Sequence, residues 1–321
     1  MYDYFMKKKV YQKFILGCEN IEEALSKGLG GVIFFSKDIN SELQVKKQIA
    51  EIKEKALISP FISIDQEGGR VERTENIISK RLSPRFSFQK GEDFLTRQAD
   101  EILSEIKDLG FNLNFAPCID VNTNPQNPII GERAFSDNSY DVIKGMKIFV
   151  EQSRKNSVIP CVKHFPGHGD ADKDSHLELP MIDLSMQTME ETHIRPFKEA
   201  VKDNIEMVMV AHLYCTCFDK TSIPSSLSSN VVGYLRNTLG YKGVVITDDM
   251  IMRGVESYGS LEACIMAIKA GVDMFIFRNS DEKTLKLIEE LVLIVEKDKD
   301  LRQKVEESFE RIIALKSRFN L

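Results

Sequence analysis

The sequence is short of positive charge and of long apolar runs, and each shortage excludes a class of protein. Its 43 lysines and arginines are outnumbered by 49 acidic residues, which gives a formal net charge of −6. A nucleic-acid partner favours a basic surface, so we expect none. No apolar stretch approaches the roughly 20 residues that cross a bilayer, so the sequence predicts no membrane contact.

We also expect neither a secretory signal nor a disulfide framework. Lys7 to Lys9 resemble the start of a signal peptide, but Gln12 and Lys13 break the apolar run that should follow. A cleavable signal needs a longer apolar centre. The six cysteines are scattered, mostly within apolar runs, which is typical of free thiols in a reducing compartment. We therefore expect a cytoplasmic protein. The cysteines are Cys18, Cys118, Cys161, Cys215, Cys217 and Cys264.

Short apolar runs alternate with segments of helical spacing along the whole chain. The helical spacing is clearest at 45–56 and at 301–319, where apolar residues recur every three or four positions. Continuous apolar runs suit strands that are covered on both faces, as in a parallel sheet. The eight runs are 14–17, 32–35, 61–65, 113–120, 161–165, 207–212, 244–248 and 274–277.

Eight such units in 321 residues predict an α/β fold, a closed (β/α)8 TIM-like barrel. The alternative is a doubly wound open sheet, which normally has a glycine-rich turn after its first strand. Residues 14–20, FILGCEN, contain no such turn. Because no linker interrupts the pattern, we expect a single domain over residues 1–321, and a monomer.

Polar residues lie at the ends of five of the predicted strands. Asp65, Asp120, His212 and Asp248 end strands three, four, six and seven, and Lys163 with His164 lies in strand five. In a barrel of this type, the loops after the strands converge over the mouth. Burying charged groups is costly unless they are paired or used. The pattern therefore predicts a functional site at this end of the barrel.

The segment after strand five, residues 163–180, is long and rich in glycine and aspartate. Loops of this length in compact domains are usually functional. It contains Asp174 two residues before His176. A carboxylate at that spacing can bind one imidazole nitrogen and leave the other to move protons. A solvated turn with local hydrogen bonds is the alternative interpretation.

Several segments resemble family 3 glycoside hydrolases, specifically the single-domain β-N-acetylglucosaminidases of bacterial cell-wall recycling. They are IDQEGGRV at 64–71, NFAP at 114–117 with Asp120, GERAF at 131–135, the segment 163–180 and GVVITDD at 243–249. The resemblance runs from about residue 14 to the last helices. Family 3 β-glucosidases usually take their acid/base from a second domain, and here the Asp174–His176 segment is expected to replace it.

The resemblance implies a role for each matched residue. Asp248 is the expected nucleophile, and His176 is the expected general acid/base, oriented by Asp174. The implied reaction is retaining hydrolysis of terminal N-acetylglucosamine from N-acetylglucosaminyl-anhydro-N-acetylmuramic acid, with or without peptide, and it needs no metal or cofactor. The residues expected to bind sugar hydroxyls are Asp65, Arg73, Arg133, Lys163 and His164.

Structural explanations remain open for several of these positions. Asp65 could cap a loop, Arg133 could form a surface ion pair, and Lys163 with His164 could be a buried pair. Asp249 is predicted to cap the helix that follows its strand.

Other residues receive structural expectations or none. His168 is predicted to shape the Pro-Gly turn and His193 to face solvent. The sequence assigns no role to His212 or to the pair Cys215 and Cys217.

Other functions compete with this interpretation. A Schiff-base aldolase could use Lys163. A metal hydrolase could use His164, His168, His176 and Cys215, although their spacing matches no compact ligand motif. A non-catalytic sugar-binding module would need neither catalytic element. Within the family, a β-glucosidase and an N-acetylglucosaminide phosphorylase remain open, since a histidine repels incoming phosphate less than a carboxylate does.

Overall fold

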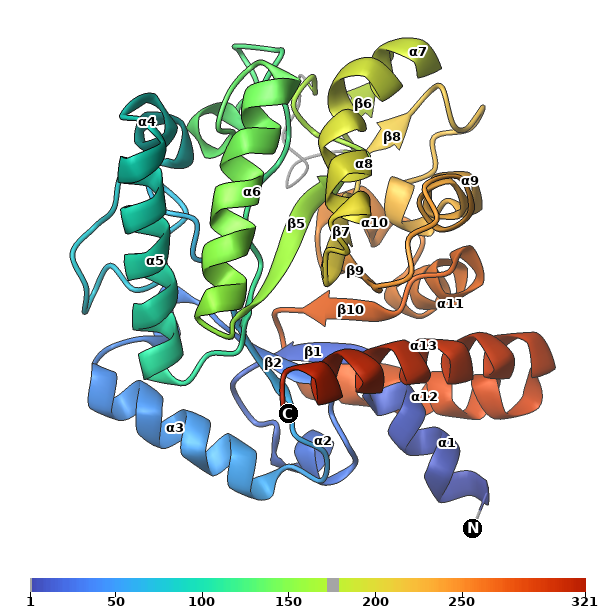
Figure 1. The fold of residues 1–321 in the computed structure, drawn as a ribbon. Helices are drawn as coiled ribbons and strands as arrows, with labels where there is room; N and C mark the ends of the chain where they lie inside the picture. The colour runs from blue at the N-terminus through green and yellow to red at the C-terminus, as the bar shows by residue number, and fades with distance from the viewer. Residues whose placement is uncertain (1, 172–178) are drawn as a thin grey trace.

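The computed structural model describes residues 2–171 and 179–321, and within them eight parallel strands close into a barrel. Going round the barrel, the order is β1-β10-β9-β7-β5-β4-β3-β2, and every neighbouring pair is parallel. Helices surround these strands (Figure 1). The predicted (β/α)8 architecture is confirmed.

The strands agree with the predicted apolar runs to within two residues at each end, except for the fourth, where regular pairing covers only Leu113–Asn114 of the predicted 113–120. A separate two-stranded parallel sheet pairs β6 with β8. The strands are β1(Phe14–Gly17), β2(Gly31–Phe34), β3(Phe61–Ile64), β4(Leu113–Asn114), β5(Ile159–Phe165), β6(Met181–Ile182), β7(Met207–Val210), β8(Tyr214–Cys215), β9(Val244–Asp249) and β10(Met274–Phe277).

The helices follow the predicted periodicity. Val45, Ile49 and Ile52 are the buried residues of α3, whose N-cap Ser41 accepts a hydrogen bond from the backbone N–H of Gln44. None of the described helices combines the length and the apolar character needed to cross a membrane. The α-helices are α1(Tyr2–Tyr11), α2(Glu22–Ser26), α3(Glu42–Lys55), α4(Pro84–Gln89), α5(Glu92–Leu109), α6(Ser139–Lys155), α7(Met186–Thr188), α8(Arg195–Lys202), α9(Ser229–Gly233), α10(Arg253–Glu256), α11(Ser260–Ala270), α12(Glu282–Lys297) and α13(Lys299–Arg318). Short 3-10 or π turns are η1(Ser36–Asp38), η2(Gly131–Arg133), η3(Met189–His193), η4(Ser225–Leu227) and η5(Tyr234–Thr238).

Side chains alternate between two cores along each barrel strand. On β9, Val244 and Ile246 belong to the cluster inside the barrel, while Val245 packs in the layer between strands and helices. Alternation follows from the period of two in a β-strand. Strand-end residues in register with the inner set therefore point into the mouth of the barrel.

The opposite end of the barrel is closed by α13. Ile312 and Leu315 pack against the inner cluster. The buried Lys316 donates from Nζ to Gly30 O at 2.9 Å and to Gln12 Oε1 at 2.8 Å. Burial lowers the pKa of Lys316 to about 7. These contacts tie the last helix to the segments that enter β1 and β2, so this end holds the fold together.

Candidate active site

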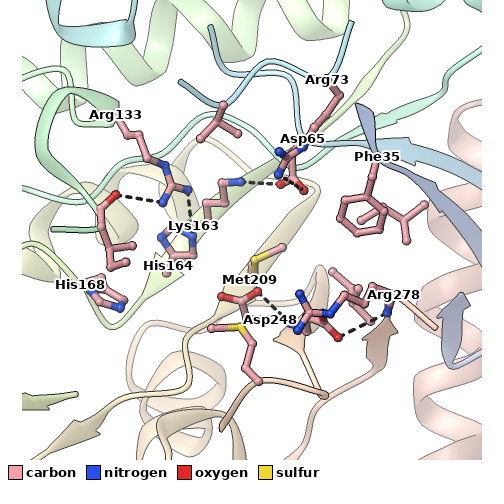
Figure 2. A pocket seen from close by; sticks show the side chains of 16 residues that line it. Phe35, Asp65, Arg73, Arg133, Lys163, His164, His168, Met209, Asp248 and Arg278 are labelled. Carbon is pink, nitrogen blue, oxygen red and sulfur yellow. Dashed lines mark hydrogen bonds and ion pairs between the residues drawn. The ribbon is translucent and has the colours of Figure 1, made fainter. Parts of the chain in front are cut away.

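A cavity of about 360 Å³ opens at the carboxyl ends of the barrel strands (Figure 2). Every hydroxyl-binding residue predicted from the sequence contributes to its wall, and so does the predicted nucleophile. The lining residues are Ile33, Phe35, Asp65, Val71, Arg73, Ile129, Arg133, Lys163, His164, His168, Met209, Asp248, Asp249, Met252, Ile276 and Arg278.

Asp248 lies near the end of β9, in register with the inward-facing Ile246. Its Oδ1 accepts a hydrogen bond of 2.7 Å from the backbone N–H of Asp249. Burial alone would raise the pKa of Asp248, but the imidazoles of His164 and His212 and the Lys163 ammonium favour the carboxylate and hold that pKa below its ordinary value. An ionised, partly exposed carboxylate in a cavity wall can act as a nucleophile.

Lys163 joins two acids at the centre of the cavity. Its Nζ lies 2.7 Å from Asp65 Oδ1 and 2.7 Å from Glu67 Oε1. Burial alone would lower the pKa of Lys163, but the charges of Asp65 and Glu67 hold it above its ordinary value. An imine-forming lysine must be neutral to attack, so this environment disfavours the aldolase alternative.

Glu67 is a buried ion-pair partner of both Lys163 and Arg133, and the sequence did not predict this role. Its side chain is 1% exposed. Arg133 binds it with two hydrogen bonds, Nε to Oε2 at 2.9 Å and Nη2 to Oε1 at 2.8 Å. Burial alone would raise the pKa of Glu67, but Arg133 and Lys163 hold it well below its ordinary range. Arg133 is thus buried in a bidentate pair and is not a surface ion pair.

Asp120 orients His164 from beneath the cavity. Its Oδ2 lies 2.7 Å from His164 Nδ1, and its carboxylate also accepts the backbone N–H groups of His164 and His168. Burial alone would raise the pKa of Asp120, but these partners hold it well below its ordinary value. Nε2 of His164 lies 3.4 Å from Arg133 Nη2 at the cavity side. The arrangement fixes the plane of the His164 imidazole in the cavity wall.

Arg73 and His168 complete the polar wall. Arg73 lies over the Phe35 ring, 5.7 Å from its centroid, with Nη2 3.7 Å from Asp65 Oδ2. The buried His168 ring has no hydrogen-bond partner within the described residues. Burial lowers its pKa to about 4, so the ring is neutral near pH 7. His168 therefore lines the cavity in addition to lying in the predicted turn.

Two structural expectations are wrong. Asp249 does not cap the next helix, because α10 has Met252 at its N-cap; instead Asp249 Oδ2 pairs with Arg278 Nε at 3.0 Å. His193 does not face solvent but is 1% exposed, because it lies on η3 and packs against Gly167.

His212, Cys215 and Cys217 are not among the residues that line the cavity. His212 is buried between Ser226 Oγ, 2.6 Å from Nδ1, and the backbone oxygen of Asp249, 3.2 Å from Nε2. These contacts explain His212 as a support for β9. The Sγ atoms of Cys215 and Cys217 lie 3.4 Å apart.

The described residues do not test the predicted Asp174–His176 dyad, but they do bear on the metal-hydrolase alternative. Asp174 and His176 lie outside the described residues. Among those that are described, one group offers three metal-ligand atoms within 4.8 Å of one another, Cys118, Asp120 and His164. Its Asp120–His164 contact already serves as a hydrogen bond, and the group does not include His168 or Cys215.

Comparison with known proteins identifies the family. Residues 8–315 match the model of the glycosyl hydrolase family 3 N terminal domain. The chain belongs to glycosyl hydrolase family 3. It is 31% identical to "Beta-hexosaminidase A" of Pseudoalteromonas piscicida over 90% of this chain and 53% of that protein. It is also 31% identical to "Beta-hexosaminidase" of Photobacterium profundum over 82% of this chain and 78% of that one.

A solved relative has the same fold. The structure of a glycoside hydrolase family 3 beta-N-acetylglucosaminidase from Paenibacillus sp. superposes with a TM-score of 0.92 at 32% identity, and covers 98% of this chain and 62% of that one. The resemblance inferred from the sequence is confirmed at the level of the family, whose members are glycoside hydrolases. This chain spans about half the length of the Pseudoalteromonas relative.

Proposed function

We propose that this chain is a retaining β-N-acetylglucosaminidase that acts through a covalent glycosyl intermediate on Asp248. The proposal rests on one observation. Asp248, whose pKa is lowered, lines the same cavity as the residues predicted to bind sugar hydroxyls. The names of the relatives, beta-hexosaminidase and beta-N-acetylglucosaminidase, support the choice of sugar.

The hydroxyl-binding groups would fix the sugar ring. Asp65 accepts hydrogen bonds from hydroxyls, and the Lys163 ammonium and Arg133 guanidinium donate them. Because Glu67 and Asp120 hold Arg133, Lys163 and His164 rigidly, little motion has to be frozen when substrate binds.

The chemical steps would use a nucleophile and an acid. An oxygen of Asp248 bonds to the anomeric carbon while the bond from that carbon to the leaving oxygen breaks. The leaving oxygen takes a proton from His176, which Asp174 orients. Water then attacks the same carbon, gives a proton to His176 and releases Asp248. Two inversions at one carbon retain its configuration.

The substrate proposed is N-acetylglucosaminyl-anhydro-N-acetylmuramic acid, with or without peptide. A cytoplasmic location, a monomeric state and a small carbohydrate as the only partner belong to the same proposal. Each alternative would give a different product. A β-glucosidase would release glucose, and a phosphorylase would release a sugar 1-phosphate.

The deciding experiment compares 4-nitrophenyl N-acetyl-β-glucosaminide with the matching β-glucoside. We expect kcat/KM to be at least about a hundredfold higher for the N-acetylglucosaminide, because a site that binds the acetamido group leaves its polar partners unpaired with glucose. NMR of the first-formed sugar should show the β-anomer. Preference for the glucoside would overturn the proposal, and a sugar 1-phosphate formed only in phosphate buffer would reassign the enzyme as a phosphorylase.

Replacing His176 tests the proposed acid. His176→Ala should slow cleavage of N-acetylglucosaminyl disaccharides by about 10²–10⁴-fold, the usual contribution of general acid catalysis. Cleavage of the 4-nitrophenyl substrate should slow far less at the glycosylation step, since nitrophenolate leaves without a proton. Single-turnover rates measure that step. Ser175→Ala is the control from the same segment, and equal losses on both substrates would count against the acid role.

A further inference from the structure

Arg278 is a cation in the cavity wall, and the proposed catalytic steps do not use it. It follows β10, in register with the inward-facing Ile276. Its side chain is 45% exposed. It also borders a second hollow of about 200 Å³, so it stands between the two spaces. The hollow is lined by Gly17, Cys18, Glu19, Asn20, Lys37, Asp38, Arg278, Asn279, Ser280 and Asp281.

Asp249 holds Arg278 through the Nε atom of its guanidinium and through its backbone N–H. The ion pair runs from Arg278 Nε to Asp249 Oδ2 at 3.0 Å, and the backbone N–H of Arg278 donates to Asp249 Oδ1 at 3.4 Å. Within residues 2–171 and 179–321, this is the one ion pair of the Arg278 side chain. Among the described residues, no hydrogen bond from the two terminal nitrogens of the guanidinium is found, so these nitrogens can bind a second anion in a fork.

In the barrel order, Arg278 lies further than Asp248 from the hydroxyl-binding groups Arg133, Lys163 and His164. Arg133, Lys163 and His164 come from β5 and the segment that follows β4, and β10 lies across the barrel from β4. Asp65 and Arg73 follow β3. Asp248 is on β9, beside β10. In Figure 2, Asp248 lies between Arg278 and the group of Arg133 and His164. If the anomeric carbon sits over Asp248, the part of the substrate beyond it extends towards Arg278.

The acids of the second hollow are already engaged. Glu19 pairs with Lys37 at 2.7 Å, and Asp38 Oδ2 accepts the backbone N–H of Phe35 at 2.9 Å. Asp281 caps α12 by accepting from Thr284. Arg278 thus offers unmatched hydrogen-bond donors at the boundary of the cavity, and a carboxylate matches their planar geometry.

We infer that Arg278 binds a carboxylate carried by the leaving group and so makes this chain selective for anionic leaving groups. The inference rests on the proposed function and adds a specificity-determining residue to it. Asp249 is then a positioning residue that fixes the guanidinium plane.

The test compares two disaccharides that differ in one charge. N-acetylglucosaminyl-N-acetylmuramic acid carries a lactyl carboxylate on its leaving sugar, and di-N-acetylchitobiose carries none. Arg278→Met should lower kcat/KM for the anionic disaccharide by roughly ten- to a hundredfold more than for chitobiose, on the scale of a hydrogen bond to a charged group. Arg278→Lys should recover part of the difference, because it restores the charge but not the fork.

Lys37→Met is the matched control. Lys37 lines the same hollow, its side chain is 65% exposed, and the substitution removes a cation there. It should keep the wild-type ratio between the two substrates. Equal losses for both substrates in Arg278→Met, no loss for the anionic one, or an equal change in Lys37→Met would each overturn the inference. If the wild-type protein cleaves neither disaccharide nor the aryl substrate, the proposed function fails first.

Discussion

Asp248→Ala is expected to lower kcat by about 10⁴–10⁶-fold, the range measured when a nucleophile or its essential partner is removed from another hydrolase. The reason is that the oxocarbenium-like transition state loses both its counter-charge and its bonding partner. The thermal midpoint should change little, because the carboxylate is partly exposed and accepts one local hydrogen bond. The measurements are kcat on the aryl substrate and a melting curve.

Covalent trapping identifies the residue directly. A fluorinated N-acetylglucosaminyl fluoride should add one sugar mass to the wild-type peptide that contains Asp248, and fragmentation should place the sugar on Asp248 and not on Asp249. Because the pKa of Asp248 is held below its ordinary value, its carboxylate stays ionised through mildly acidic pH. A fall in activity near neutral pH is therefore expected to report the titration of a group other than Asp248. Label on a different residue, or wild-type turnover by Asp248→Ala, would contradict the mechanism.

The sequence was sufficient to predict the barrel because continuous apolar runs and helical spacing are local patterns. It could not give the length of β4. Pro117 has no N–H to donate, so the regular ladder ends at Asn114, although the following residues stay buried. The chain still runs beside β5, with Lys163 N–H donating to Pro117 O at 3.3 Å and Ile119 N–H to Lys163 O at 2.8 Å. An apolar run thus predicts burial more reliably than it predicts pairing.

The site was predictable in part for the same reason. Charged residues at strand ends stand out in a sequence, and Asp65, Lys163 and Asp248 line one cavity. Arg278 was missed because no motif marks it. Its signal was the alternation along β10, since Ile276 faces the inner core and Arg278 is two residues further on.

Glu67 was missed for a different reason. It lies in the segment IDQEGGRV, but only the structure shows that Arg133, 66 positions away, binds both of its oxygens. Pairing at that distance leaves no local pattern. The misassignment of Asp249 has a related origin, because its partner Arg278 comes from the next barrel strand.

Glu67→Gln is expected to lower the free energy of unfolding by about 3–5 kcal/mol, the usual cost of removing one partner from a buried ion pair. Glu67 is the shared acceptor of Arg133 and Lys163, and it is 1% exposed. Without its charge, Arg133 keeps no carboxylate partner among the described residues, and Lys163 keeps only Asp65. Activity should fall as well, because both cations would lose their fixed positions. Urea unfolding and kcat/KM measure the two effects.

Glu306→Gln is the control, because the Glu306 side chain is 44% exposed, its partner Lys9 is 12% exposed, and ion pairs open to solvent contribute at most about 1 kcal/mol. The pH dependence supplies a second check. Since the folded-state pKa of Glu67 is lowered, its contribution to stability is complete above the ordinary glutamate pKa and is lost as pH falls towards the lowered value. The stability gap between wild type and Glu67→Gln should therefore be widest near neutral pH and narrow in acid. A gap no larger than that of Glu306→Gln would mean that Arg133 and Lys163 are held by other contacts, and the rigid cation pair would no longer explain how the sugar is fixed.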